Sequence, residues 1–287
     1  MTRETRWLRA QGPRLAVDVQ GDADAPAVLF LHGLTMSRDT WQETIAALQP
    51  DFCCWALDFR GHGDSDHADS YGLPDYLEDA RSALTAIGRP AFVVGHSLGG
   101  AVAGVLAQAD PRVRAALLED PPWFLGEPES ARASGYDRRF EVTRLLIERL
   151  RRDQAPLAEY QAFLSIMPVG TGTAREHISE RHLRSRAAAM QRLDPATLSP
   201  VGPVLASLEP GAPFRSPVTI LPAEVSPAFG PGHENRLNHE GAPIRVIRRA
   251  GADHTMHIQH QTEAWFIDTV RQWLSTAHSA GSSPQTG

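Results

Sequence analysis

A serine between two glycines is the best-placed residue in this sequence for nucleophilic chemistry. Ser97 lies in Gly95-His-Ser-Leu-Gly99, after the apolar run 91–94 and before a segment whose apolar residues recur with helical spacing. A sharp turn from a strand into a helix would lift the Ser97 hydroxyl clear of a sheet, and flanking glycines avoid backbone collisions there. Because the five-residue pattern also arises by chance, the prediction rests on the strand before it and the helix after it. We predict that Ser97 is a nucleophile.

The composition indicates one large globular domain with room for an inserted subdomain. The chain has 287 residues, of which 42% are hydrophobic, and a formal net charge of −6. This mild acidity argues against nucleic acid or an anionic membrane as a partner. No apolar run reaches the roughly 18 residues of a membrane span, and the charged N-terminal segment has no apolar signal region. We therefore expect a cytoplasmic protein, with Cys53 and Cys54 as buried thiols.

The alternation of predicted elements indicates a parallel sheet covered by helices on both faces. Continuous apolar runs predict buried strands at 27–31, 52–57, 91–94 and 114–119. Helical patterns are predicted between them at 39–48, at 74–87 and directly after Ser97. In such sheets ligands bind beyond the carboxyl ends of the strands. Four polar residues follow predicted strands and should gather at that edge: His32, Asp58, Ser97 and Asp120.

The pattern changes in the middle of the chain. Residues 124–213 contain no convincing strand, and helices are predicted at 136–153, 157–166 and 174–193. We interpret this segment as a helical lid inserted into a core made of residues 1–123 and 214–278. Strands resume at 217–221 and 243–247, and a last helix is predicted at 262–276. The tail, residues 279–287, has a linker-like composition and is expected to be disordered.

Several landmarks together resemble the α/β-hydrolase superfamily. They occur in the order expected for that superfamily: His32-Gly33, Asp58-x-Arg60-Gly61-x-Gly63-x-Ser65, the Ser97 motif, and Gly251-Ala-Asp-His254. The resemblance covers almost the whole chain apart from the predicted lid and tail. It implies an α/β-hydrolase fold, with a mostly parallel twisted sheet, helices on both faces and an inserted helical lid.

The resemblance also implies roles for two side chains. Ser97 matches the position of the nucleophile, and His254 matches the histidine of the family's G-x-x-H motif. A serine hydroxyl needs such an imidazole to take its proton at neutral pH. His257 and His260 lie close by and compete for the role of base, but the motif position favours His254.

Backbone groups and supporting residues follow from the same resemblance. The oxyanion hole would consist of the backbone N–H groups of Leu34 and Leu98, one after His32-Gly33 and one after the serine. The remaining side chains of the matched loops are interpreted as structural supports. These are His32, Asp58, Arg60 and His62.

The carboxylate that must orient the base is less clearly marked. Many α/β-hydrolases carry this acid after the seventh strand, where this chain offers only Glu224. Others carry it after the sixth strand, where this chain has Glu119-Asp120-Pro121. Side chains alternate along a strand, so Glu119 and Asp120 cannot both point at the histidine. Asp120 leaves the strand end and is favoured, Glu224 is the alternative, and Glu119 comes third.

The expected function is hydrolysis of a carboxylic ester or lactone through an acyl-enzyme. Alternatives on the same scaffold are a carbon–carbon bond hydrolase, an acyltransferase, a perhydrolase or haloperoxidase, a hydroxynitrile lyase, and a non-enzymatic ligand receptor. Dehalogenases and epoxide hydrolases of this superfamily use an aspartate nucleophile, so Ser97 argues against both. The sequence contains no metal-ligand cluster and no nucleotide-binding motif, so we expect neither metal nor cofactor.

Aromatic residues in and beside the predicted lid suggest the kind of substrate. Trp123, Phe124 and Phe163 are candidate substrate-binding residues. Such residues would suit a hydrophobic ester or lactone of medium to large size. The alternative, equally favoured, is that they form the ordinary core of the lid.

Overall fold

An eight-stranded sheet forms the centre of the computed structural model, which describes residues 3–9, 12–225 and 227–281. The strand order is β1-β2-β4-β3-β5-β6-β9-β10, and β2 runs in the direction opposite to the other described strands of this sheet. The predicted mostly parallel sheet is thus confirmed. The strand bounds are β1 Glu4–Arg9, β2 Arg14–Gln20, β3 Ala27–Leu31, β4 Cys53–Leu57, β5 Ala91–His96, β6 Val113–Glu119, β9 Val218–Leu221 and β10 Ile244–Val246.

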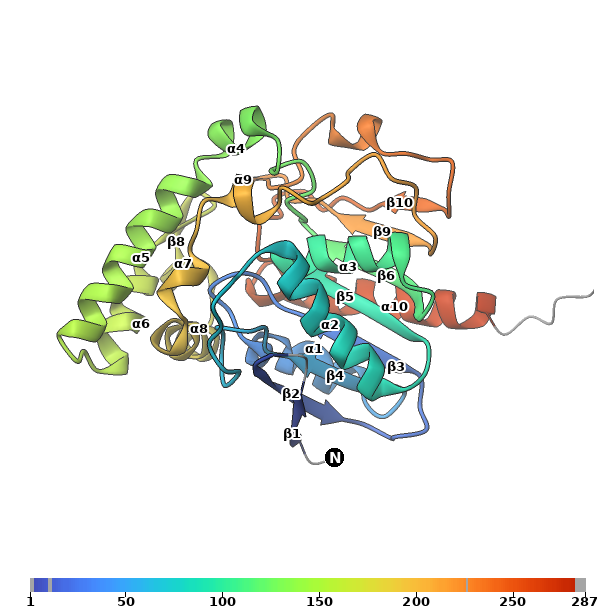
Figure 1. The fold of residues 1–287 in the computed structure, drawn as a ribbon, viewed down its shortest axis with the longest axis horizontal. Coiled ribbons are helices and arrows are strands. Elements are labelled where there is room, and N and C mark those ends of the chain that lie inside the picture. Colours follow the sequence, from blue (N-terminus) through green and yellow to red (C-terminus); the bar gives the residue numbers. More distant parts are fainter. Residues whose placement is uncertain (1–2, 10–11, 226, 282–287) are drawn as a thin grey trace, which may run out of the picture.

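Helices cover both faces of this sheet (Figure 1). On one face α2 (Leu73–Ile87) and α3 (Leu98–Ala109) pack against alternate strand residues such as Leu29 and Val93. On the other face α1 (Gln42–Leu48) and α10 (Glu263–Gly281) pack against the intervening residues, such as Val28 and Val94. Because both faces are buried, every second residue enters a different core, which explains the continuous apolar runs in the sequence.

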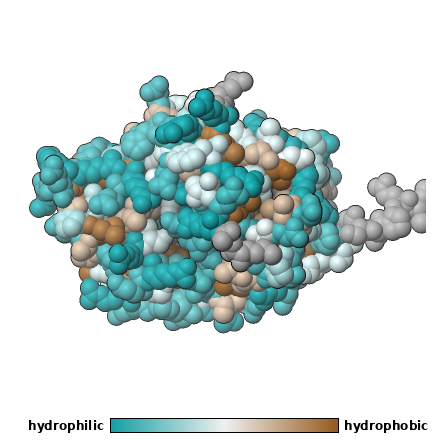
Figure 2. Space-filling view, turned by 90° about the horizontal axis from the view of Figure 1, so that it is seen from below, coloured by the Kyte–Doolittle hydropathy of each residue, from teal (hydrophilic) through white to brown (hydrophobic). Residues whose placement is uncertain are grey.

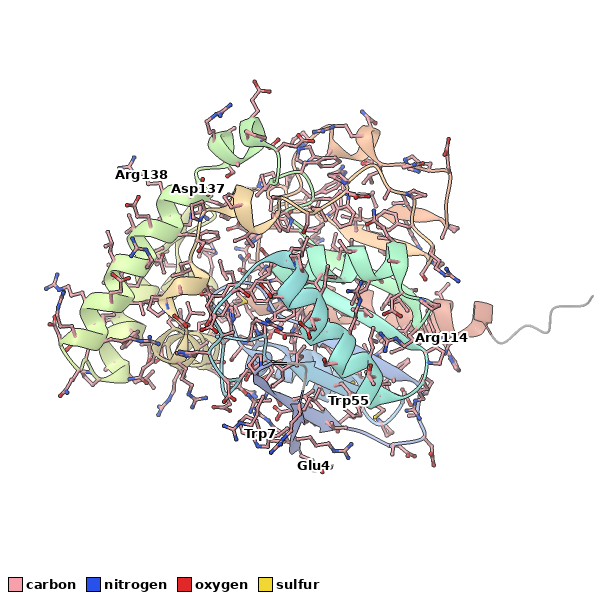
Figure 3. All side chains as sticks on the ribbon, viewed as in Figure 1. Glu4, Trp7, Trp55, Arg114, Asp137 and Arg138 are labelled. Atoms are coloured by element: carbon pink, nitrogen blue, oxygen red, sulfur yellow. The ribbon has the colours of Figure 1, made fainter. Side chains whose placement is uncertain are left out.

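Six helices lie between β6 and β9, within the segment 124–213 that we interpret as an inserted lid. The helices are α4 Pro128–Ser134, α5 Tyr136–Arg152, α6 Leu157–Ser165, α7 Ala174–His177, α8 Glu180–Arg192 and α9 Val201–Val204. Helices α5 to α8 build a third apolar core, which includes Met36 and Ile258 from the sheet domain, whereas α4 and α9 pack against the core of α2 and α3. At the start of α5, Asp137 accepts a hydrogen bond from the backbone of Val201, 2.7 Å away, while Arg138 projects outward (Figure 3).

One feature of the insertion was not predicted. Residues Pro168–Val169 (β7) and Gly172–Thr173 (β8) pair as a short antiparallel hairpin. Strands of two residues are too short to show the alternation on which strand prediction depends.

The C-terminal prediction also needs correction. Helix α10 continues to Gly281, so residues 279–281 of the expected disordered tail are helical, and residues 282–287 lie outside the described part. Cys53 and Cys54 are buried free thiols, as predicted. None of the helices in the described ranges has the length and apolar character needed to cross a membrane. The face seen in Figure 2 is largely hydrophilic, with hydrophobic residues in small scattered groups.

The supporting residues of the matched loops form a buried polar network. Asp58 pairs with the Arg38 guanidinium and accepts a hydrogen bond from the Asp64 backbone at 2.9 Å. His32 accepts a hydrogen bond from the Phe59 backbone through Nε2, at 3.1 Å. The loops after β3 and β4 are thereby tied together below the carboxyl edge of the sheet.

The buried His62 in this network should make stability depend on pH. Burial lowers the pKa of His62 to about 4, whereas an unfolded histidine has a pKa of about 6.5. Between pH 4 and pH 6.5, His62 is protonated in the unfolded chain but neutral in the folded one. The contribution of neutral His62 to the free energy of unfolding is therefore complete above pH 6.5 and is lost as the pH falls toward 4. In His62→Asn the slope of the unfolding free energy against pH should flatten there by up to about 1.4 kcal/mol per pH unit.

Urea titrations of both proteins at several pH values measure this slope. Asparagine can keep the contact that His62 Nδ1 makes with the Arg60 carbonyl, at 2.9 Å, so the comparison targets the ionisation. Equal slopes in the two proteins would show that His62 does not remain neutral in the folded state.

Candidate active site

Ser97 occupies a strained position between β5 and α3. Its backbone angles are φ 51° and ψ −115°, outside the regions that L-residues favour. The Ser97 N–H donates a hydrogen bond to the Glu119 carbonyl at 2.9 Å, which ties the turn to the end of the neighbouring strand β6. The surrounding sheet therefore holds the serine in a conformation that the residue alone would avoid.

The two glycines of the motif allow this turn to close. A side-chain carbon on Gly95 would lie 2.1 Å from the Gly99 carbonyl oxygen, and one on Gly99 would lie 2.2 Å from the Leu31 oxygen. Both clashes are with backbone, which cannot move aside without opening the turn. Glycine at both positions is thus a steric requirement of this backbone path.

A chain of hydrogen bonds joins three of the predicted site residues. His254 Nε2 lies 3.1 Å from Ser97 Oγ, and His254 Nδ1 lies 2.6 Å from Asp120 Oδ2. Because an ionised carboxylate can only accept, Nδ1 carries the proton and Nε2 is left to accept from the serine hydroxyl. This arrangement has the geometry of a nucleophile, a base and an orienting acid.

Asp120 is held from several directions. Its Oδ1 accepts hydrogen bonds from the backbone of Ala223 at 3.1 Å and Phe229 at 3.0 Å, and its Oδ2 accepts from Ala228 at 2.8 Å. The side chain is fully buried, and the backbone has a φ of 40°. The loop after β9 thus surrounds the carboxylate with N–H donors, which stabilise its charge and fix its direction.

The two other candidate acids lie elsewhere. Glu224 is exposed and accepts a hydrogen bond from the Gly251 backbone at 2.6 Å. Glu119 lies on the opposite side of its strand from Asp120, and its Oε2 is 2.7 Å from His257 Nδ1. His257 Nε2 is in turn 2.7 Å from Thr40 Oγ1, so this competing histidine is engaged in a separate buried pair.

His96 is a further residue of the site whose role the sequence analysis did not identify. Its Nε2 donates a hydrogen bond to the backbone carbonyl of His254 at 2.9 Å, and its ring lies 4.9 Å from the His254 ring. Burial, and then the nearby His254 and His257, lower the pKa of His96 well below its usual value. A neutral His96 therefore holds the backbone of the candidate base, and its place beside Ser97 in the motif was the available signal.

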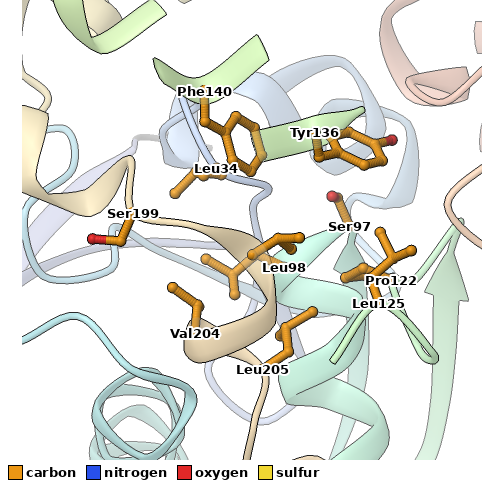
Figure 4. A pocket seen from close by; sticks show the side chains of 11 residues that line it. Leu34, Ser97, Leu98, Pro122, Leu125, Tyr136, Phe140, Ser199, Val204 and Leu205 are labelled. Carbon is orange, nitrogen blue, oxygen red and sulfur yellow. The ribbon is translucent and has the colours of Figure 1, made fainter. Parts of the chain in front are cut away.

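A small apolar pocket opens beside the serine. Its volume is about 30 Å³, and the Ser97 hydroxyl points toward it beneath the ring of Tyr136 (Figure 4). Leu34 and Leu98 line the same pocket, and among the described residues their backbone N–H groups donate no hydrogen bond. Two unused donors beside a serine fit the predicted oxyanion hole. The sequence held no signal for Tyr136.

A second cavity, of about 220 Å³, adjoins His254. Phe163, one of the candidate substrate-binding residues, lines this cavity. Trp123 and Phe124 line neither cavity and are 1% and 2% exposed. Trp123 packs against Gly104 of α3, where an added side-chain carbon would lie 2.2 Å from its ring. Both residues belong to the core that the sheet forms with α2 and α3, and neither belongs to the apolar core of the insertion, so the structure places them in neither of the two expected positions.

Comparison with known proteins agrees with this architecture. The sequence model of the Alpha/beta hydrolase family matches residues 28–269. The chain belongs to this family. Among curated members, it is 28% identical over 246 residues to 2-succinyl-6-hydroxy-2,4-cyclohexadiene-1-carboxylate synthase of Serratia proteamaculans, covering 83% of this chain and 90% of that protein.

A mouse serine hydrolase-like protein is 36% identical over 132 residues, which cover 44% of this chain and only 42% of the mouse protein. The alpha/beta hydrolase fold is also seen in solved structures. The enol-lactonase from Burkholderia xenovorans superposes with a TM-score of 0.73, at 20% identity, over 94% of this chain and 100% of the other. Epoxide hydrolase A from Mycobacterium thermoresistibile superposes with a TM-score of 0.71, at 21% identity, over 94% and 98%.

Proposed function

We propose that this alpha/beta hydrolase is a serine enzyme that cleaves a carboxylic ester or lactone through an acyl-enzyme. The observation that carries the proposal is the hydrogen-bonded chain from Ser97 through His254 to Asp120. The names of two similar proteins, an enol-lactonase and a serine hydrolase-like protein, support the same class of reaction.

Each residue has a physical task in this mechanism. His254 takes the proton of Ser97 as the oxygen attacks the carbonyl carbon, and Asp120 stabilises the imidazolium that forms. The N–H groups of Leu34 and Leu98 stabilise the negative oxygen of the tetrahedral intermediate. His254 then protonates the leaving alcohol, and a water molecule activated by the same imidazole releases the acyl group.

Trapping the acyl-enzyme tests this proposal directly. Mixing the protein with p-nitrophenyl acetate should release up to one equivalent of p-nitrophenol per site in a rapid phase. Mass spectrometry of acid-quenched protein should find the acetyl group on the peptide that contains Ser97. A protein that binds esters without any release or acylation would instead be the ligand receptor of this fold.

We also propose that residues 124–213 act as a lid that selects substrates. Helices α5, α6 and α8 contribute residues to the cavity beside His254, which supports this role. Phe163→Ala should change the order in which esters of increasing acyl length are hydrolysed, because it enlarges that cavity. A uniform loss of rate for all esters would contradict a specificity role for this residue.

Trp123→Ala serves as the matched contrast, because Trp123 is buried outside both cavities. It should lower the free energy of unfolding by about 3–5 kcal/mol, the usual cost of removing a large core side chain. The order of preference among the esters should stay the same. Thermal unfolding and the same ester series measure both effects.

A further inference from the structure

The cavity beside His254 contains an arginine without a counter-ion. Arg186 lies on α8 and lines this cavity, of about 220 Å³. Among the described residues its guanidinium has no hydrogen-bond or salt-bridge partner, and its Nε is enclosed by protein atoms. Two other arginines of the same helix, Arg181 and Arg192, form ion pairs with Glu43 and Asp64.

This isolation is energetically unusual. Burying a charge without a partner is costly, and charged side chains inside proteins are ordinarily paired. Removal from water lowers the pKa of Arg186 to about 10, and no neighbouring carboxylate offsets that effect. Arg186 nevertheless stays protonated at neutral pH and carries an uncompensated positive charge.

The one carboxylate in the lining of this cavity is already engaged. Asp253 Oδ2 accepts a hydrogen bond from the Gly170 backbone at 2.7 Å, and its Oδ1 accepts from the His254 backbone at 2.7 Å. Arg139, which also lines the cavity, is exposed and packs over the ring of Tyr136 at 5.0 Å. The cavity therefore has two positive side chains and one carboxylate that is committed to backbone groups.

The rest of the lining suits a hydrocarbon. Most of the other side chains at the wall are apolar, and they come from the insertion. They include Phe140, Phe163, Leu164, Met167, Val169 and Met190. A ligand that fits would have an apolar body and one anionic end.

We propose that Arg186 binds a carboxylate carried by the substrate, which makes this enzyme a hydrolase of anionic esters or lactones. This inference rests on the proposed function, because the cavity is assigned to substrate through its contact with His254. The planar guanidinium presents paired N–H donors that match the two oxygens of a carboxylate. A carboxylate there would complete the missing ion pair in a partly buried site, where such a contact is stronger than in bulk water.

Pairs of esters that differ only in charge test the inference. One pair is 3-acetoxybenzoate and 3-acetoxybenzamide, and the other is monophenyl glutarate and the phenyl ester of glutaramic acid. The wild-type kcat/KM should favour the anionic member of at least one pair by at least about tenfold. In Arg186→Gln most of this preference should be lost, mainly through an increase in KM for the anionic ester, because the charged hydrogen bonds are removed.

Two further variants separate the contact from general effects of charge. Arg186→Lys should show a preference between those of the wild type and Arg186→Gln, since lysine keeps the positive charge but lacks the paired N–H donors of a guanidinium. Arg184→Gln removes an exposed charge from the same helix and should leave the preference unchanged. Hydrolysis of both members of each pair at equal rates by the wild type would overturn the inference and leave the proposed function intact.

Binding measurements keep the inference testable if no ester is hydrolysed and the proposed function fails. Calorimetry of Ser97→Ala with 3-acetoxybenzoate and with monophenyl glutarate should detect binding of at least one. The additional Arg186→Gln substitution should weaken that binding by about 30-fold. Absence of binding, or binding that is indifferent to Arg186, would overturn the inference in that case.

Discussion

Ser97→Ala is expected to lower kcat for p-nitrophenyl acetate by roughly 10⁴- to 10⁶-fold, the loss typical of a removed nucleophile. The reason is that the Ser97 oxygen is the atom that His254 Nε2 faces at 3.1 Å. Alanine keeps the side-chain carbon and removes only that oxygen, so the folded structure should persist. Steady-state kinetics and the amplitude of the rapid phase of p-nitrophenol release measure the effect. Both kcat and this amplitude should fall in the variant.

Two controls accompany this experiment. Circular dichroism and thermal unfolding should be close to those of the wild type, which excludes global misfolding as the cause. Ser82→Ala removes a hydroxyl that bonds only within helix α2, to the Glu78 carbonyl at 3.0 Å, and should retain full activity. Activity of Ser97→Ala within tenfold of the wild type would remove Ser97 as the nucleophile.

Asp120→Asn should lower turnover by about 10⁴-fold, as expected when the orienting acid can no longer fix the tautomer of the base. The carboxylate receives the His254 imidazole and three backbone N–H groups. An asparagine has only one acceptor oxygen, so its amide nitrogen must face some of these donors. Either the histidine changes its tautomer or buried N–H groups lose their partners. The second outcome would lower the free energy of unfolding by about 1–3 kcal/mol.

Glu224→Gln is the matched comparison for this variant. Glutamine can still accept the hydrogen bond from the Gly251 backbone, and the side chain is exposed, so turnover should remain within about threefold of the wild type. The opposite outcome, a large loss in Glu224→Gln and a small one in Asp120→Asn, would assign the acid to the loop after β9.

Local patterns in the sequence predicted most of the fold. The runs that form β3, β5 and β6 are apolar throughout because both sheet faces are covered, and that feature is visible without a structure. The turn at Ser97 could be predicted because its glycines are required by contacts within a few residues and with the adjacent strand. The hairpin at 168–173 and the extent of α10 were missed, since short strands and helix ends carry weak signals.

The candidate site divides in a similar way. Alternation along β6 was enough to predict that Glu119 and Asp120 point in different directions, as the structure shows. The same reasoning could not say where Trp123 and Phe124 pack, because their burial depends on Gly104, Phe214 and Phe229, which are distant in sequence. It also could not separate Arg186 from the other arginines of its helix.

The sequence by itself determined the types of residue that stand at the ends of the strands, because strand, turn and helix follow from neighbouring residues. Only the tertiary structure decided which carboxylate meets which histidine: Asp120 and His254 are 134 residues apart, and Glu119 and His257 are 138 apart. The tertiary structure was also needed to show that Arg186 lines the cavity beside His254 and has no counter-ion among the described residues. Such pairings depend on how the loops of the sheet and the inserted helices pack together. A local sequence pattern does not specify which of these distant residues come into contact.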